Sequence, residues 1–277
     1  MQNISSNLDD RLKKLFVASQ EKGSSSWLSA LPLKNLGYAL NPQQFRNSIF
    51  VRYGWEIPGL PKFCACGDKN DLDHLLTCKK GGYVTMRHNF LRNTEAKILE
   101  EVCKDVKLEP ELIPTQLELE GADGDAARPD ISARGVWNPC EKTFLGVIVT
   151  HPTTKTNLPL SMEKIYLARE NCKKAKYNDR IINIEKASFT PLVFTTIGGM
   201  GPECEQFNRR LAELISNKRK EKYCHVMAHL RTRLRFALLK AIVIAIHGYR
   251  GANKHKDDET PLSEVSYNLI PEAKPVD

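Results

Sequence analysis

Hydrophobic positions recur every three or four residues over most of the chain, which is the spacing of amphipathic helices. The pattern predicts one helix beginning near Pro42 and four more over residues 83–106, 160–186, 203–218 and 222–247. The last of these holds an apolar run from Phe236 to Ile246, interrupted only by Lys240. That run is shorter than the roughly 20 apolar residues that cross a bilayer, so it predicts a helix buried in protein.

Shorter apolar runs between these helices predict strands. Asp130-Ile-Ser-Ala and Thr143-Phe-Leu-Gly-Val-Ile-Val-Thr flank a turn near Asn138-Pro139, which is typical of a β-hairpin. A third strand is expected over residues 191–196, before the turn Gly198-Gly-Met-Gly. The order helix, hairpin, helix, strand, helices predicts an α/β (α+β) fold.

Charge adds a candidate partner. Lysine and arginine outnumber acidic residues to give a formal net charge of +8. Such a chain attracts polyanions, so nucleic acid is the first partner to consider, although a basic protein without one has the same composition. No apolar leader follows the first methionine, and we expect a soluble intracellular protein, nuclear or cytoplasmic, neither secreted nor bound to a membrane.

Four residues have the spacing of a metal site. Cys64-Ala-Cys66 is followed by a Gly-Asp turn, and His74 and Cys78 lie four residues apart on one helical turn. Three thiolates and one imidazole form a normal structural Zn²⁺ set, and so short a segment gains folding energy from a metal. A single residue between the first two cysteines is fewer than usual, which leaves four unrelated residues, or redox-active thiols, as alternatives.

These residues, with Arg87-His88-Asn89 and Arg128-Pro129-Asp130-Ile, resemble the carboxy-terminal region of site-specific non-LTR retrotransposon polyproteins and related transposon-associated reading frames. The likeness extends to Ser24-Ser-Ser-Trp-Leu-Ser-Ala-Leu-Pro and Ser188-Phe-Thr-Pro-Leu-Val-Phe. It implies a zinc knuckle followed by a restriction-like PD-(D/E)XK endonuclease that nicks target DNA. It also implies DNA rather than RNA as the main partner, with a reverse transcriptase or a second copy of the chain as further partners.

Composition and the resemblance together divide the chain into six parts, the first of which ends in a Gly-Ser run that is typical of a linker. They are a polar segment and linker (1–26), a packing segment (27–60), the zinc knuckle (61–82), a restriction-endonuclease-like core (83–202), C-terminal helices (203–250) and a disordered tail (251–277).

The implied site residues follow from the same resemblance. Asp130 is the expected ligand of Mg²⁺ or Mn²⁺, and Lys173 the lysine that stabilises charge at the scissile phosphate. Expected nucleic-acid contacts are Arg87, His88, Lys174 and Lys176. The chain departs from the expected endonuclease motif at Gly146-Val-Ile-Val, where the family it resembles has Asp-Val-x-Val. A lost carboxylate predicts weak or absent nicking, unless Glu95, Glu163 or Glu170 replaces it.

Each assignment has a simpler structural alternative. Asp130 after a proline is also typical of a turn or cap, and His88 of a core or capping histidine. Three lysines on one helix are consistent with a solvated face. The Gly198–Gly201 run could cradle phosphate or merely turn the chain, and His151 is a candidate for activating water. Three hypotheses therefore stand: a metal-dependent nuclease, a non-catalytic DNA- or RNA-binding module, and an inactive or co-opted relic.

Overall fold

The computed structural model describes residues 8–114 and 128–248, which form a mixed α/β structure with one small sheet. Four helices come before the sheet region: α2 (Asp10–Gln20), α3 (Ser26–Ser29), α4 (Pro42–Tyr53) and α5 (Leu72–Thr77). The central part comprises α6 (Tyr83–Glu100), β1 (Lys104–Leu108), β2 (Ile131–Arg134), β3 (Lys142–Thr150), α8 (Met162–Asn183) and β4 (Ser188–Thr195). Two long helices follow, α9 (Pro202–Arg219) and α10 (Tyr223–His247).

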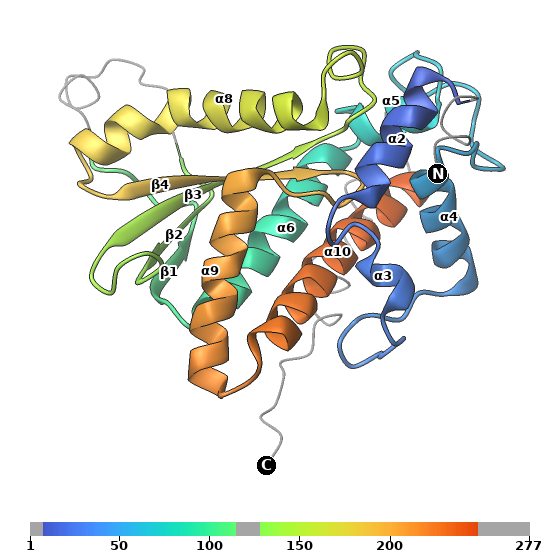
Figure 1. Cartoon of the computed structure of the whole chain (residues 1–277). Coiled ribbons are helices and arrows are strands. Elements are labelled where there is room, and N and C mark those ends of the chain that lie inside the picture. Colours follow the sequence, from blue (N-terminus) through green and yellow to red (C-terminus); the bar gives the residue numbers. More distant parts are fainter. Residues whose placement is uncertain (1–7, 115–127, 249–277) are drawn as a thin grey trace, which may run out of the picture.

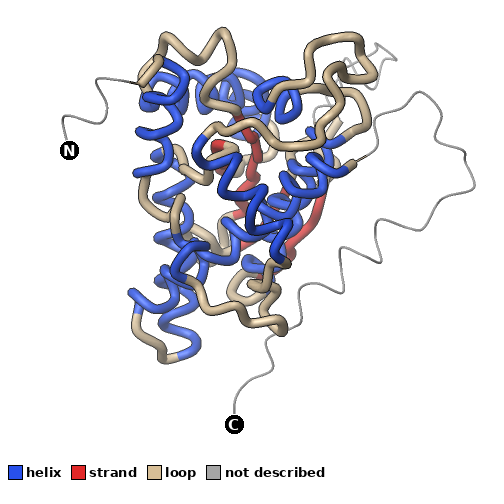
Figure 2. Tube along the Cα trace, turned by 90° about the vertical axis from the view of Figure 1, so that its right-hand side faces the viewer, coloured by secondary structure: helices blue, strands red, loops and turns tan. Residues whose placement is uncertain are grey.

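The sheet has the strand order β1-β2-β3-β4. The predicted hairpin is confirmed, because β2 pairs antiparallel with β3 and Ser132 lies opposite Phe144. Strand β4 pairs parallel with β3, with α8 as the crossover between them. Helix α8 covers one face of the sheet while α6 and α9 lie on the other (Figure 1), and a view turned by 90° shows the strands enclosed by helices (Figure 2).

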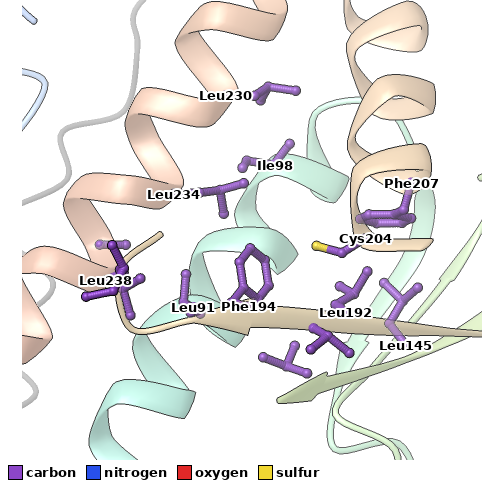
Figure 3. Close-up of a cluster of buried hydrophobic side chains, with 14 of the residues drawn as sticks. Leu91, Ile98, Leu145, Leu192, Phe194, Cys204, Phe207, Leu230, Leu234 and Leu238 are labelled. Atoms are coloured by element: carbon purple, nitrogen blue, oxygen red, sulfur yellow. The ribbon is translucent and has the colours of Figure 1, made fainter. Parts of the chain in front are cut away.

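The main core lies between the sheet and helices α6, α9 and α10. Leu192 and Phe194 of β4 meet Leu91 and Ile98 of α6 and Phe207 of α9 (Figure 3). All five side chains are at most 1% exposed. Burying a side chain of this size stabilises the fold by about 1.5–3 kcal/mol. The apolar run of α10 is also buried, as its sequence predicted.

One predicted helix is too long at its C-terminal end. We expected helix over residues 83–106, but α6 ends at Glu100 and residues 104–108 form the edge strand β1. Lys107 pairs with Ser132, and Asp105 has a left-handed φ of 52° at an irregularity in the pairing. Backbone pairing with β2 outweighs the weak helical periodicity of this charged segment.

The Gly-Ser run at residues 23–26 is not a linker. Ser24 is fully buried, and its hydroxyl donates a hydrogen bond to the carbonyl of Ser19 over 2.6 Å. Arg235 of α10 donates to the Ser24 carbonyl over 3.1 Å. Leu15 and Ala18 of α2 belong to the main core. Small polar residues therefore pack closely here against α10.

The predicted tail at 251–277 lies outside the described residues. No helix in the described part of the chain has the length and apolarity needed to cross a membrane.

Candidate functional site

The four predicted metal ligands are brought together, with their donor atoms all within 4.8 Å of one another. The Sγ atom of Cys78 lies 3.8 Å from the Sγ atoms of both Cys64 and Cys66. The Sγ of Cys66 lies 3.2 Å from Nε2 of His74. Two thiolates bound to zinc at about 2.3 Å with tetrahedral angles are separated by about 3.8 Å. The donor set and its spacing fit a metal such as zinc.

Local structure explains how these donors converge. The turn at Gly67, with φ 98°, returns the chain so that the Cys64 amide donates to the Asp68 carbonyl over 2.9 Å. Asp71 caps α5 by accepting from the His74 amide over 2.9 Å, and Cys78 ends the same helix. Burial raises the pKa of the Cys64 thiol, but hydrogen bonds from the other three ligand residues outweigh it and lower the pKa to about 7. A bound metal favours the same thiolate form.

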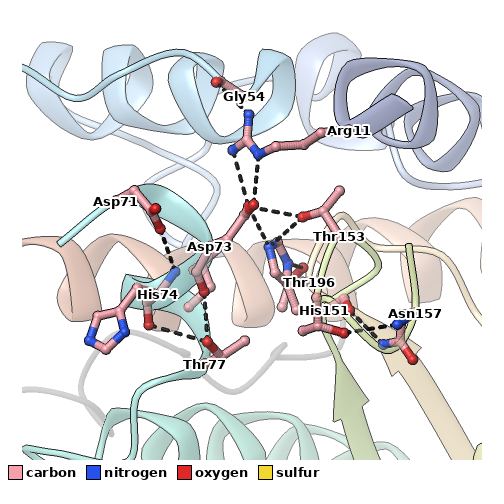
Figure 4. A network of polar contacts seen from close by, with 12 residues as sticks. Arg11, Gly54, Asp71, Asp73, His74, Thr77, His151, Thr153, Asn157 and Thr196 are labelled. Atoms are coloured by element: carbon pink, nitrogen blue, oxygen red, sulfur yellow. Dashed lines mark hydrogen bonds and ion pairs between the residues drawn. The ribbon is translucent and has the colours of Figure 1, made fainter. Parts of the chain in front are cut away.

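A partly buried polar network links α5, which carries His74, to the rest of the fold (Figure 4). The carboxylate of Asp73, one residue before His74, pairs with Arg11 of α2 over 2.6 Å. It also lies 2.9 Å from Nε2 of His151, whose Nδ1 lies 2.6 Å from the Thr196 hydroxyl. His151 is only 3% exposed. It therefore joins α5 to the sheet and is not placed to activate water.

Arg87 is part of the same attachment. Its side chain is 4% exposed and donates from Nη1 to the carbonyl of Leu76 in α5 over 2.9 Å. Burial lowers the pKa of its guanidinium to about 10. The predicted phosphate contact at Arg87 is not supported by this position, because the guanidinium is buried against the end of α5.

A second cluster forms at the start of β2, where Asp130 meets helices from both faces of the sheet. Its Oδ1 lies 2.8 Å from Nε2 of His88 in α6, and its Oδ2 lies 3.0 Å from Nζ of Lys173 in α8. Oδ2 also accepts from the backbone N–H of Val147 over 2.7 Å. The predicted pair of Asp130 and Lys173 is brought together, and His88, predicted to contact nucleic acid, completes the cluster.

Position 146 faces this cluster. A β-carbon added to Gly146 would stand 3.2 Å from the Lys173 side chain and 2.8 Å from the ring of Phe189 in β4. A carboxylate at position 146 would therefore be beside Lys173 and Asp130. In this chain the ring of Phe189 occupies the adjoining space.

None of the three substitute carboxylates joins Asp130. Glu95 is fully buried two helical turns beyond His88, where its Oε1 accepts from Asn208 of α9 over 3.3 Å. Glu170 accepts from the backbone N–H of Glu203 over 3.1 Å. Glu163 is exposed in the first turn of α8, ten residues before Lys173. The candidate catalytic role of Glu95 is thus not supported by its position.

The remaining lysines differ in their surroundings. Nζ of Lys174 pairs with Glu203 over 2.6 Å, so its charge is already balanced. Lys176 is exposed, with Nζ 5.6 Å from the centre of the Tyr177 ring.

The glycine run at 198–201 turns the chain from β4 into α9. A β-carbon on Gly199 would stand 1.8 Å from the Glu21 carboxylate, which accepts from the Tyr166 hydroxyl over 2.7 Å. Glu21 and Tyr166 fill the space beside Gly199, which leaves no room for a phosphate there, so the turn is structural.

Mg²⁺ or Mn²⁺ does not fit the Asp130 cluster as it stands. Burial raises the pKa of Asp130, but the hydrogen bond from His88 and the charge of Lys173 outweigh it and hold the pKa below its ordinary value. Hard divalent cations need several oxygen ligands. Among the described residues, Asp130 is the one carboxylate of the cluster, and a lysine, a histidine and an amide already use its oxygens.

Sequence reasoning missed Asp73 and Phe189, which determine how the two clusters are built. Asp73 contacts segments that are 62 or more residues away in the sequence. Phe189 reaches Gly146 only through the pairing of β4 with β3. No protein-family model matches the chain, and a search of curated proteins found no similar sequence.

Proposed function

We propose that the chain is a nucleic-acid-binding module of mobile-element origin, in which a zinc knuckle is joined to a restriction-endonuclease-like core that has lost metal-dependent DNA nicking. The order α6, hairpin, α8, β4 is compatible with that core. The Cys₃His cluster is compatible with the knuckle, and the net charge of +8 favours a polyanionic partner.

The observation that best supports a loss of nicking is that both carboxylate oxygens of Asp130 are already paired. A nuclease needs carboxylates that hold a cation against the scissile phosphate. Here Lys173 and His88 take the place of the cation at the two oxygens of Asp130, and Gly146 supplies no second carboxylate. The cluster therefore carries no excess negative charge with which to attract Mg²⁺.

A nicking assay on supercoiled plasmid, run with Mg²⁺ and with Mn²⁺ beside a gel-shift assay, tests the proposal. We expect the natural chain and its Asp130→Ala variant to leave the plasmid intact while both retard DNA, and retardation to weaken as salt rises. Nicking that disappears in Asp130→Ala would support the alternative of an active nuclease with a relocated carboxylate. Failure to retard DNA or RNA at low salt would contradict nucleic-acid binding.

A further inference from the structure

A pocket of about 660 Å³ lies beside the Cys₃His cluster. Its walls come from the first turns of α4, the loop over residues 57–61, the knuckle turn that carries Cys64, and the end of α10. The volume falls within the about 300–1,000 Å³ of typical ligand sites. No lysine, arginine, aspartate or glutamate is among the described residues that line it.

The polar groups of this pocket are amides and an imidazole. Asn47 is 4% exposed, and its Nδ2 lies 2.6 Å from Nε2 of His247. Asn70 donates from Nδ2 to the Pro61 carbonyl over 3.1 Å, while its Oδ1 is buried with no hydrogen-bond partner. Gln43 is exposed at the rim. Carboxamides can both donate and accept, as the edges of nucleobases require.

An exposed ring stands at the same pocket. Phe63 is 68% exposed, a large fraction for a phenylalanine, and it follows Lys62 and pairs across the knuckle turn with Lys69. Both lysines are exposed. Aromatic faces stack with unpaired bases whatever their sequence, and neighbouring lysines attract the phosphates that join those bases.

We propose that this pocket binds an unpaired base of a single-stranded DNA or RNA segment, with Phe63 stacking on the base and the amides of Asn70 and Gln43 contacting its edge. The inference rests on the proposed nucleic-acid binding and adds the form of nucleic acid that is recognised. A paired base within a duplex has both faces stacked, so it cannot enter. The uncharged lining and the basic rim match a base attached to phosphates.

Fluorescence anisotropy with two oligonucleotide designs tests the proposal on the full chain. One is a single strand, prepared as DNA and as RNA, and the other has the same number of phosphates but abasic sugars. The variants are Phe63→Ala, Phe63→Trp and, as an exposed control outside the pocket, Leu31→Ala, which is 70% exposed in the natural chain.

We expect Phe63→Ala to weaken binding of the normal strand by about tenfold or more and to leave abasic binding unchanged. Phe63→Trp should retain normal-strand binding, and Leu31→Ala should match the natural chain. Equal affinity of the natural chain for the normal and abasic strands would overturn the pocket but leave nucleic-acid binding intact. Absence of binding to either strand and to duplex DNA would instead overturn the proposed function.

A second measurement does not depend on any variant. A single strand carrying 5-iodouracil, irradiated with the natural chain, should crosslink to a peptide containing Phe63, because this base couples to aromatic rings on which it stacks. Crosslinks confined to peptides away from the pocket would count against the proposal.

Discussion

The ring of Phe189 lies against Gly146, 2.8 Å from the point where a β-carbon would stand. Introducing a carboxylate by Gly146→Asp alone therefore overpacks the space between β4 and α8, and we expect it to cost about 1–3 kcal/mol of unfolding free energy. The double variant Gly146→Asp with Phe189→Val makes room for the carboxylate beside Lys173. We expect Mn²⁺-dependent plasmid nicking from the double variant and none from Gly146→Asp.

The matched controls are Phe189→Val alone and the double variant with Asp130→Ala added. Neither should nick, because each lacks one of the two carboxylates. Nicking by Gly146→Asp alone would show that Phe189 is no obstacle.

The contacts of Asp130 predict a pH dependence of stability. Because Lys173 and His88 hold its folded pKa below the ordinary value of about 3.9, its contribution is present above that pH and is lost as the pH falls through the lower folded value. We expect Asp130→Asn to lower the free energy of unfolding at pH 7 by about 1–2 kcal/mol. Urea denaturation at pH 7 and below pH 4 should show this difference shrinking in acid.

The exposed Asp179 provides the comparison for this experiment. Asp179→Asn should change stability little at either pH. A constant cost of Asp130→Asn across the pH range would contradict the ion pairing.

Sequence reasoning found those features that local pattern determines. The hairpin was predictable because apolar runs flank a turn at Asn138-Pro139, and the metal cluster because four ligands share a short segment. Sequence reasoning failed where contacts between segments far apart in the chain determine the structure. Arg87 was expected on the surface, but its carbonyl partner Leu76 lies in another helix, and strand β1 exists only because β2 pairs with it.

Metal removal should loosen the segment that carries the four ligand residues without unfolding the core. Leu75 and Leu76 of α5 are buried in the main core, and Asp73 holds the helix to Arg11 and His151. We expect one Zn²⁺ per chain, and a fall in Tm of about 5–10 °C on chelation, which corresponds to a few kcal/mol. Hydrogen exchange should accelerate over residues 62–70 and remain slow in β4.

Cys66→Ser should lose the metal, whereas Cys140→Ser, at an exposed cysteine outside the cluster, should retain it. Complete unfolding on chelation would show that the core contacts of α5 are insufficient.

The burial of Arg87 predicts a loss of stability rather than of DNA affinity. Arg87→Ala removes the donor to Leu76 and leaves that carbonyl without its partner, so we expect a cost of about 2–3 kcal/mol. Lys176→Ala, at an exposed position, should cost less than about 0.5 kcal/mol. Chemical denaturation of the two variants measures both values.

For DNA binding, in contrast to stability, we expect Lys176→Ala to have a larger effect than Arg87→Ala. Replacing a lysine that contacts phosphate lowers the slope of log K against log salt by about one, which we expect for Lys176→Ala. Arg87→Ala, measured well below its Tm, should keep the slope of the natural chain. A reduced slope in Arg87→Ala would restore Arg87 as a phosphate contact.

Glu95 should destabilise the fold at neutral and alkaline pH. Complete burial raises its pKa to about 7, against the opposing effects of Asn208 and Arg233, while the unfolded value is near 4.3. The folded state therefore binds the extra proton between these values, and stability falls as the pH rises from about 4.3 through 7.

Glu95→Gln keeps the shape of the protonated acid, so urea denaturation should show it to be about 1–3 kcal/mol more stable relative to the natural chain at pH 8 than at pH 5. Glu163→Gln, at an exposed glutamate, should show no such difference. A catalytic Glu95 that faced solvent would instead give the same relative stability at both pH values, because its ionised form would cost the fold nothing.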